Sequence, residues 1–227
     1  ELYRCKSMII SKNIVNNNSR GIKLRYCKNN TISNNTANNN TGDGIFFSQS
    51  KGNTIKNNTI KSNRHNGIYF VGRSDNNTIF KNNVKDNEQN GIFFWAGDHN
   101  VIKENSIINN GRGIFLYDSD NNLVYYNCFN NTTNARDRIN SLDEVHNHWD
   151  NGTVGNHWAD YTGLDLDDNG IGDDPYTIAG YAGSQDNFPL MKCPFSAQDV
   201  VKEYKLMLIN KGETQKWLNP LDFTYFS

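Results

Sequence analysis

The chain has 227 residues, the length of one domain or of one domain with an appendage. Its 23 basic and 24 acidic residues give a formal net charge of −1, which argues against a nucleic-acid-binding protein. Aromatic residues make up 12% of the chain, which argues against disorder. No run of 18 apolar residues occurs, so we expect no membrane span. The 40 asparagines disfavour an ordinary helical enzyme, because Asn competes with the helix backbone for hydrogen bonds.

A Gly-Ile pair recurs through the first half of the chain, with spacings of 22 to 24 residues. The pairs begin at Gly21, Gly44, Gly67, Gly91 and Gly113. Aligning the chain on them produces three asparagine columns: Asn13, Asn35, Asn58, Asn82, Asn105, Asn127; then Asn18, Asn40, Asn63, Asn87, Asn110; then Asn30, Asn53, Asn77, Asn100, Asn122. Apolar columns run between them. Short strands that cannot stand alone bury such columns when they are stacked.

The pattern therefore predicts an all-β fold: a right-handed, single-stranded parallel β-helix of about six coils over residues 1–132. Asn suits its turns, because it tolerates left-handed backbone angles and its amide bonds the amides of neighbouring coils. Asn66 lies outside the columns, and we expect it to tolerate substitution. Residue 1 falls inside a coil. This suggests a fragment, a processed chain, or an end covered by another subunit.

Residues 133–195 are expected to form an irregular Asp-rich cap that contains a calcium-type loop. The loop's candidate ligands are Asp165, Asp167, Asn169, Ile171 (through its carbonyl) and Asp173, with Gly170 at the sharp turn. It departs from an EF-hand, because Tyr176 stands where the bidentate Glu would be. A solvated acidic turn is the alternative. Residues 196–227 form a tail, in which a capping-box pattern predicts a short helix at about 196–205.

The repeats and several later motifs together resemble a known family. These motifs are Asn147-His-Trp-Asp150, Gly155-Asn-His-Trp-Ala-Asp-Tyr161, the Asp165–Asp173 loop and Asp186-Asn-Phe-Pro-Leu190. The combination resembles the right-handed parallel β-helix proteins of the NosD type, as found in archaeal surface proteins. The resemblance implies an exported protein, either a surface protein or a periplasmic copper protein. A shared fold is not by itself evidence that this chain binds copper.

Asp75, Asp98 and Asp120 form one column in the third turn of successive coils. Carboxylates about 5 Å apart match the separation in a retaining glycosidase, so these three are the alternative catalytic site. They could also hold a cation. The other interpretation is a set of solvated turn residues.

Aromatic residues occupy outward positions over several coils. They are Phe46, Tyr69, Phe93 and Phe115, with Trp95 and Tyr117 two residues further along their strands. Such a patch is expected either to stack sugar rings or to be covered by the tail or a neighbouring subunit.

Four cysteines and three histidines complete the candidate residues. Cys5 and Cys27 occupy equivalent places in adjacent coils, which suits either a disulfide or an unbridged stack. Cys128 and Cys193 could tie the cap to the last coil. His146, His148 and His157 are a candidate copper or zinc cluster.

These patterns favour a non-catalytic extracellular protein, a cell-surface or sheath-like module with calcium-stabilised contacts to itself, to other surface proteins or to glycans. Two alternatives remain. One is a polysaccharide lyase, hydrolase or epimerase that uses the aspartate column, and the other is a periplasmic metal-delivery protein.

Overall fold

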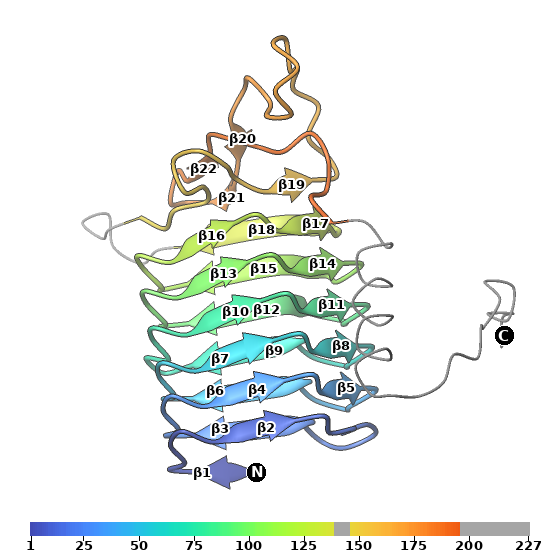
Figure 1. Cartoon of the computed structure of the whole chain (residues 1–227), viewed down its shortest axis with the longest axis vertical. Helices are drawn as coiled ribbons and strands as arrows, with labels where there is room; N and C mark the ends of the chain where they lie inside the picture. The colour runs from blue at the N-terminus through green and yellow to red at the C-terminus, as the bar shows by residue number, and fades with distance from the viewer. Residues whose placement is uncertain (139–145, 196–227) are drawn as a thin grey trace, which may run out of the picture. The chain divides into compact units, whose positions relative to one another are not determined.

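The computed structural model describes residues 1–138 and 146–195, and residues 1–194 form one compact unit. This unit is a parallel β-helix of about six coils, in which each coil contributes one short strand to each of three sheets (Figure 1). No helix occurs in the described residues. The fold predicted from the repeat is confirmed. The expected short helix at about 196–205 lies outside the described residues.

Sheet 1 contains the longest strands. It has eight, in the spatial order β1 (Leu2–Tyr3), β3 (Ile22–Arg25), β6 (Ile45–Ser48), β9 (Ile68–Val71), β12 (Asn90–Trp95), β15 (Arg112–Tyr117), β18 (Thr133–Arg138) and β21 (Ala179–Gly180). β18 pairs in parallel with β15, so sheet 1 continues past residue 132, where the sequence pattern was expected to stop.

Sheets 2 and 3 are built from strands of two or three residues. Sheet 2 consists of β2 (Ile9–Ser11), β4 (Thr31–Ser33), β7 (Thr54–Lys56), β10 (Thr78–Phe80), β13 (Val101–Lys103) and β16 (Leu123–Tyr125). Sheet 3 consists of β5 (Thr36–Asn38), β8 (Thr59–Lys61), β11 (Asn83–Lys85), β14 (Ser106–Ile108), β17 (Cys128–Asn130) and β19 (His157–Trp158). In the cap, β20 (Tyr176–Thr177) pairs antiparallel with β22 (Gln185–Asp186).

The core is made of inward columns, one residue per coil. In sheet 1, Phe47, Phe70 and Phe94 stack with ring centroids 4.5 and 4.3 Å apart. The cap continues these columns, since Trp158 stacks on Phe129 at 4.5 Å and Tyr176 stacks on Trp158 at 4.3 Å. Large buried aromatic rings thus close the apolar interior at the cap end, where the repeat stops.

The glycine of each Gly-Ile pair is required by the close approach of the next coil. A Cβ on Gly91 would lie 2.7 Å from the Gly113 carbonyl oxygen and 3.0 Å from the Asn110 amide nitrogen. No side chain larger than hydrogen fits there without moving the backbone of the adjacent coil. The repeat of glycine therefore reflects coil-to-coil spacing.

The three asparagine columns form continuous hydrogen-bonded ladders at the corners between sheets. Asn58 donates from Nδ2 to the Asn82 Oδ1 at 2.9 Å, and Asn82 donates in the same way to Asn105 at 3.0 Å. The left-handed residue of these turns is the one before the ladder Asn, such as Lys81 with φ 54° and Glu104 with φ 56°. The ladder positions thus select Asn for its amide, and the left-handed position accepts other residue types.

A fourth ladder corrects the expectation for Asn66. Its side chain is 4% exposed and donates to the Asp43 Oδ1 at 2.8 Å, while its own Oδ1 accepts from the Asn90 Nδ2 at 2.7 Å. Asn66 is therefore one rung of a buried polar ladder. The sequence-based placement of Asn66 outside every ladder was wrong, because Asp43 and Asn90 do not form a column of one residue type.

Candidate functional site

The outward face of sheet 1 concentrates aromatic and cationic side chains. Strand alternation buries every second residue and turns the others outward. The outward residues of β3 to β18 are Lys23, Arg25, Phe46, Ser48, Tyr69, Val71, Phe93, Trp95, Phe115, Tyr117, Arg136 and Arg138. No carboxylate occupies any of these twelve outward positions of the described strands. All six aromatic residues predicted from the sequence therefore share one face.

The outward rings stack mainly on each other. Tyr69 and Phe93 have centroids 4.9 Å apart with planes 3° from parallel, and Phe93 and Phe115 have centroids 5.0 Å apart at 6°. Phe46 meets Tyr69 edge to face at 5.5 Å and is only 9% exposed. Because the stacked rings occupy each other's faces, mainly their edges remain available to a ligand. Burial, followed by the charge of Asp43, raises the pKa of the Tyr69 hydroxyl, which therefore stays neutral.

Arginines cover both ends of this ring stack. The Arg20 guanidinium carbon lies 4.5 Å from the Phe46 centroid, and those of Arg112 and Arg136 lie 5.2 and 5.8 Å from the Phe115 centroid. These are cation–π distances. Arg20 also pairs with the buried Asp43 at 3.0 Å. The sequence analysis missed Arg136 and Arg138. Both lie 21 residues after an outward aromatic residue, Phe115 or Tyr117. This is close to the length of one coil, so the spacing could have placed them on the same face.

Trp95 differs from the other rings of this face. It is 48% exposed and meets Tyr117 edge to face, at 6.0 Å and 89°. It has no stacked partner among the described residues. Arg138 lies over the neighbouring Tyr117 ring at 5.3 Å. Trp95 is therefore the most exposed aromatic ring of strands β6 to β18 in sheet 1.

The aspartate column has structural hydrogen bonds. Asp75 accepts from the Lys51 Nζ at 2.6 Å and from the Asp98 backbone N–H at 3.1 Å. Asp98 accepts from the Asp120 backbone N–H at 2.9 Å. The structure thus brings the three residues together, as their spacing predicted, but Asp75 and Asp98 connect successive coils. A catalytic role for the column stays a prediction.

The proposed calcium loop is held by its own amides. Asp165 accepts from the backbone N–H groups of Asn169 at 3.0 Å and Gly170 at 2.9 Å, and Asp173 accepts from the Leu166 N–H at 2.8 Å. Gly170 adopts φ 86°, as a sharp turn requires. Within residues 1–138 and 146–195, no three His, Cys, Asp or Glu side chains are grouped to hold a metal ion. Calcium binding by this loop stays a prediction.

The histidines lie on different sheets. His148 pairs with Leu123 beside sheet 2, whereas His157 belongs to β19 in sheet 3 and pairs with Cys128. His146 is exposed. Burial lowers the pKa of His157, which favours its neutral form. The three side chains are not brought together as one ligand set.

The cysteines behave differently at the two ends of the unit. Cys128 and Cys193 form a disulfide with Cα atoms 5.4 Å apart, which ties the end of the cap to the last coil. Cys5 and Cys27 are free thiols, and the Cys5 backbone N–H donates to the Cys27 Sγ at 3.3 Å. Burial raises the pKa of the Cys5 thiol to about 11, which favours the protonated thiol at neutral pH.

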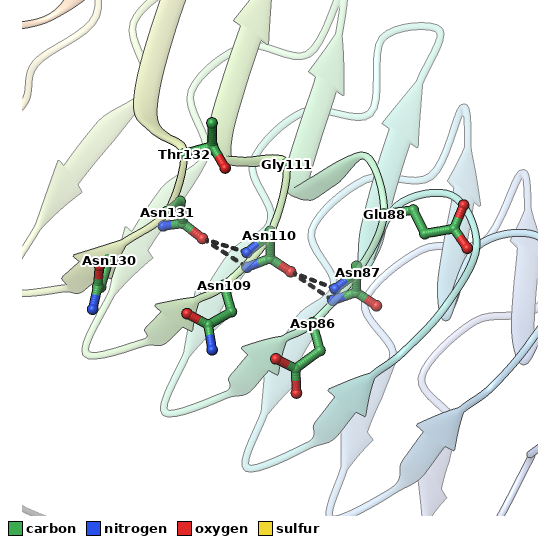
Figure 2. Close-up of a pocket in the computed structure, with 9 residues that line it drawn as sticks. All are labelled: Asp86, Asn87, Glu88, Asn109, Asn110, Gly111, Asn130, Asn131 and Thr132. Carbon is green, nitrogen blue, oxygen red and sulfur yellow. Dashed lines mark hydrogen bonds between the residues drawn. The ribbon is translucent and has the colours of Figure 1, made fainter.

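A shallow polar depression of about 620 Å³ lies beside the second asparagine ladder. Figure 2 shows Asp86, Asn109 and Asn130 in a row next to the ladder of Asn87, Asn110 and Asn131. Its lining contains no aromatic residue, histidine or cation. It therefore lacks the features of the outward face of sheet 1, which is the better candidate site.

The fold and this face define a parallel β-helix protein with an aromatic and cationic outer surface. A family model matches residues 1–163, and the chain belongs to that family, described as "Periplasmic copper-binding protein (NosD)". The described residues do not fit a copper centre, because the histidines lie on different sheets and no group of three metal-ligand side chains occurs among them. No curated protein sequence matches the chain.

Solved β-helix structures resemble the chain in fold. The periplasmic alginate epimerase AlgG has a TM-score of 0.59 at 22% identity, over 62% of this chain and 35% of the epimerase. The A-module of the Azotobacter vinelandii mannuronan C-5 epimerase AlgE4 has a TM-score of 0.44 at 12% identity, over 64% of this chain and 54% of that module. The chain thus spans about a third of AlgG and about half of the AlgE4 module. At these identities the likeness shows the fold alone.

No helix within the described ranges has the length and apolar character needed to cross a lipid bilayer.

Proposed function

We propose that the chain is a non-catalytic contact module of an exported β-helix protein, and that it binds glycan through the outward face of sheet 1. The observation that carries the proposal is the exposed Trp95 ring beside a continuous aromatic stack. Aromatic side chains are enriched in contact surfaces, because they bury a large area at a low entropic cost. The periplasmic description of the family supports export.

The regular spacing of this surface suits an extended ligand. The outward rings of β9, β12 and β15 repeat every 4.9 to 5.0 Å along the stack. A polymer that lies along the stack meets a similar set of side chains at each coil. We place the sugar contact at Trp95 rather than along the whole stripe, because the stacked rings cover each other's faces. This refines the interpretation from the sequence alone.

A binding role also agrees with the hydrogen bonds of the aspartate column. Asp75 and Asp98 already accept hydrogen bonds that connect coils, and Asp75 is additionally paired with Lys51. A general acid or base must be free to exchange a proton with its substrate. The epimerase activity of AlgG gives no argument for turnover here, since the likeness shows the fold alone.

The test compares two matched aromatic substitutions. Trp95→Ala removes the most exposed ring of strands β6 to β18 in sheet 1, and Phe80→Ala removes a partly exposed ring of sheet 2. Binding to a panel of soluble polysaccharides is measured by calorimetry, and product formation is followed on the same samples. We expect binding that Trp95→Ala weakens and Phe80→Ala preserves, without turnover. Two outcomes would overturn the proposal. One is the absence of glycan binding, and the other is cleavage or epimerisation that is lost in Asp98→Asn.

Association between copies of the chain is the competing outcome for the same face. Light scattering of the two variants separates it from glycan binding. If Trp95→Ala changes the oligomeric state and no glycan binds, the face is a protein contact and the glycan proposal fails.

A further inference from the structure

The outward face of sheet 1 ends in three arginines without carboxylate partners. Arg112, Arg136 and Arg138 have no ion pair within the described residues. The cations at the other end differ, because Arg20 pairs with Asp43 at 3.0 Å and Lys23 pairs with Glu1 at 3.1 Å. Among the described strands β3 to β18 of this face, the arginines without an ion pair therefore lie at the cap end.

From this arrangement we infer that the glycan bound here is a carboxylate-bearing polysaccharide of the polyuronate class. The inference rests on the proposed function and specifies its ligand. The site consists of Trp95, Phe115 and Tyr117 with Arg112, Arg136 and Arg138, and we call it the arginine–aromatic cluster.

The positions of the arginines favour carboxylate binding. Arg138 lies 5.3 Å from the Tyr117 centroid, and Arg112 and Arg136 lie 5.2 and 5.8 Å from the Phe115 centroid. Packing against a ring restricts the mobility of a guanidinium and lowers the entropy lost when it binds. A guanidinium can donate two parallel hydrogen bonds to one carboxylate. Three of them, provided by adjacent strands β15 and β18, can bind carboxylates on successive units of an extended chain.

Trp95 supplies the complementary contact for the sugar ring. It lies in β12, adjacent to β15, and its ring is 48% exposed beside Tyr117. A uronate unit can place its apolar ring face on the indole and direct its carboxylate to Arg138, which lies over the Tyr117 ring. One uronate unit can therefore contact both the Trp95 ring and the Arg138 guanidinium. A neutral sugar would contact only the ring, and a simple anion only the guanidinium.

Charge segregation on this face supports the same ligand class. The chain as a whole is nearly neutral, with 23 basic and 24 acidic residues, yet the outward positions of β3 to β18 contain no carboxylate. A polyanion is attracted to such a face without crossing acidic side chains. Single-stranded nucleic acid shares the negative charge and the stacking rings. We favour polysaccharide because the family is described as periplasmic.

The test compares ligands that differ only in charge. Binding of the whole chain is measured for polygalacturonate, for its fully methyl-esterified form of equal length, and for single-stranded DNA, each at low and high salt. We expect binding to polygalacturonate that falls with salt, and at least tenfold weaker binding to the ester. Arg138→Gln should weaken polygalacturonate binding by about tenfold, as the loss of a charged hydrogen bond predicts.

Lys56→Gln is the matched control variant. Lys56 lies 5.9 Å from the Phe80 centroid, so it repeats a cation over a ring on sheet 2. It should leave the affinity unchanged, and circular dichroism checks that each variant is folded. If Arg138→Gln does not fold, Arg138→Lys replaces it in the test. Arg138→Lys keeps the positive charge but not the paired donors, so it should bind polygalacturonate more weakly than the wild type does.

The outcomes separate the two proposals. Equal affinity for the acid and the ester, lost in Trp95→Ala, would overturn the polyuronate inference and leave glycan binding intact. Binding to single-stranded DNA as tight as to polygalacturonate would also overturn it, because the site would then recognise polyanions in general. Binding to no polysaccharide would overturn the proposed function itself.

Discussion

Replacing Asn82 with leucine tests the ladder architecture directly. The Asn82 side chain is 2% exposed and makes five hydrogen bonds. It accepts from the backbone N–H and Nδ2 of Asn58 at 3.0 and 2.9 Å. It donates to the carbonyl oxygens of Ile55 and Phe80 and to the Asn105 Oδ1. Leucine has a similar volume but can replace none of these bonds.

The magnitude follows from the groups that lose a partner. The Asn58 Nδ2 still donates to the carbonyl oxygens of Ile32 and Lys56, and the Asn105 Oδ1 still accepts from the Asn82 backbone. The Asn58 backbone N–H loses its acceptor and the buried Ile55 carbonyl loses a donor, whereas the Phe80 carbonyl still accepts from the Asn57 N–H. At about 1–3 kcal/mol for each stranded group, partly relieved by relaxation, we expect a loss of about 3–5 kcal/mol. For a chain of this size that lowers the melting temperature by about 10 °C.

The adjacent residue provides the control. Asn83 is exposed on β11, where a side chain faces solvent, so Asn83→Leu should change stability by less than about 0.5 kcal/mol. Thermal melts followed by circular dichroism compare the two variants with the wild type. Equal shifts for Asn82→Leu and Asn83→Leu would refute the argument that buried amides hold the coils together.

Three further outcomes follow. Asn66→Leu should destabilise the protein by about 2–4 kcal/mol, because it interrupts the ladder between Asp43 and Asn90, and thermal melts would contradict this by showing no change. Burial raises the pKa of Asp186 from 3.8 to about 6, so the unfolded chain releases this proton at lower pH than the folded one. The contribution of Asp186 to the free energy of unfolding therefore falls by about 3 kcal/mol as the pH rises from about 4 to about 6, and it is constant above that. This dependence of stability on pH should vanish in Asp186→Asn. A calcium chelator should lower the melting temperature, and Asp167→Ala should remove that sensitivity; a wild type unaffected by chelator would count against the calcium loop.

The repeat period made most of the β-helix predictable. Three columns share one residue type, and their spacing places Asn58, Asn82 and Asn105 in register without any further information. The fourth ladder was missed because its rungs are Asp43, Asn66 and Asn90, and a mixed column gives no repeat of one letter. Its chemistry still follows from the register, since residues 23 or 24 apart face each other in adjacent coils.

The site was predictable only in part. The outward aromatic positions follow from strand alternation, but side-chain rotamers decide whether rings stack on one another or remain exposed, and only the structure distinguishes Phe93 from Trp95. The unpaired arginines were missed for another reason. Arg136 and Arg138 lie in β18, which continues sheet 1 without a Gly-Ile pair, so the sequence pattern ended one strand early.

The three asparagine columns share a polarity that explains the acidic character of the cap, since each donates toward it. The fourth ladder runs the opposite way, from Asn90 through Asn66 to Asp43. Each amide donates from Nδ2 to the next Oδ1, so the last amide of a ladder needs an acceptor that has nothing to donate. The last asparagine of each ladder donates to a carboxylate: Asn156 to Asp186, Asn134 to Asp160, Asn147 to Asp137, and Asn66 to Asp43.

An asparagine in place of the buried Asp137 or Asp186 would accept the same hydrogen bond but bury a new donor without a partner. The ionised carboxylate ends the chain, and its charge strengthens the final bond. Asp137 and Asp186 also accept the indole N–H groups of Trp149 and Trp158 at 3.2 and 2.8 Å, so the rings that close the core are fixed by the same side chains that end the ladders. The Trp-Asp composition of the cap is therefore a consequence of the asparagine ladders beneath it.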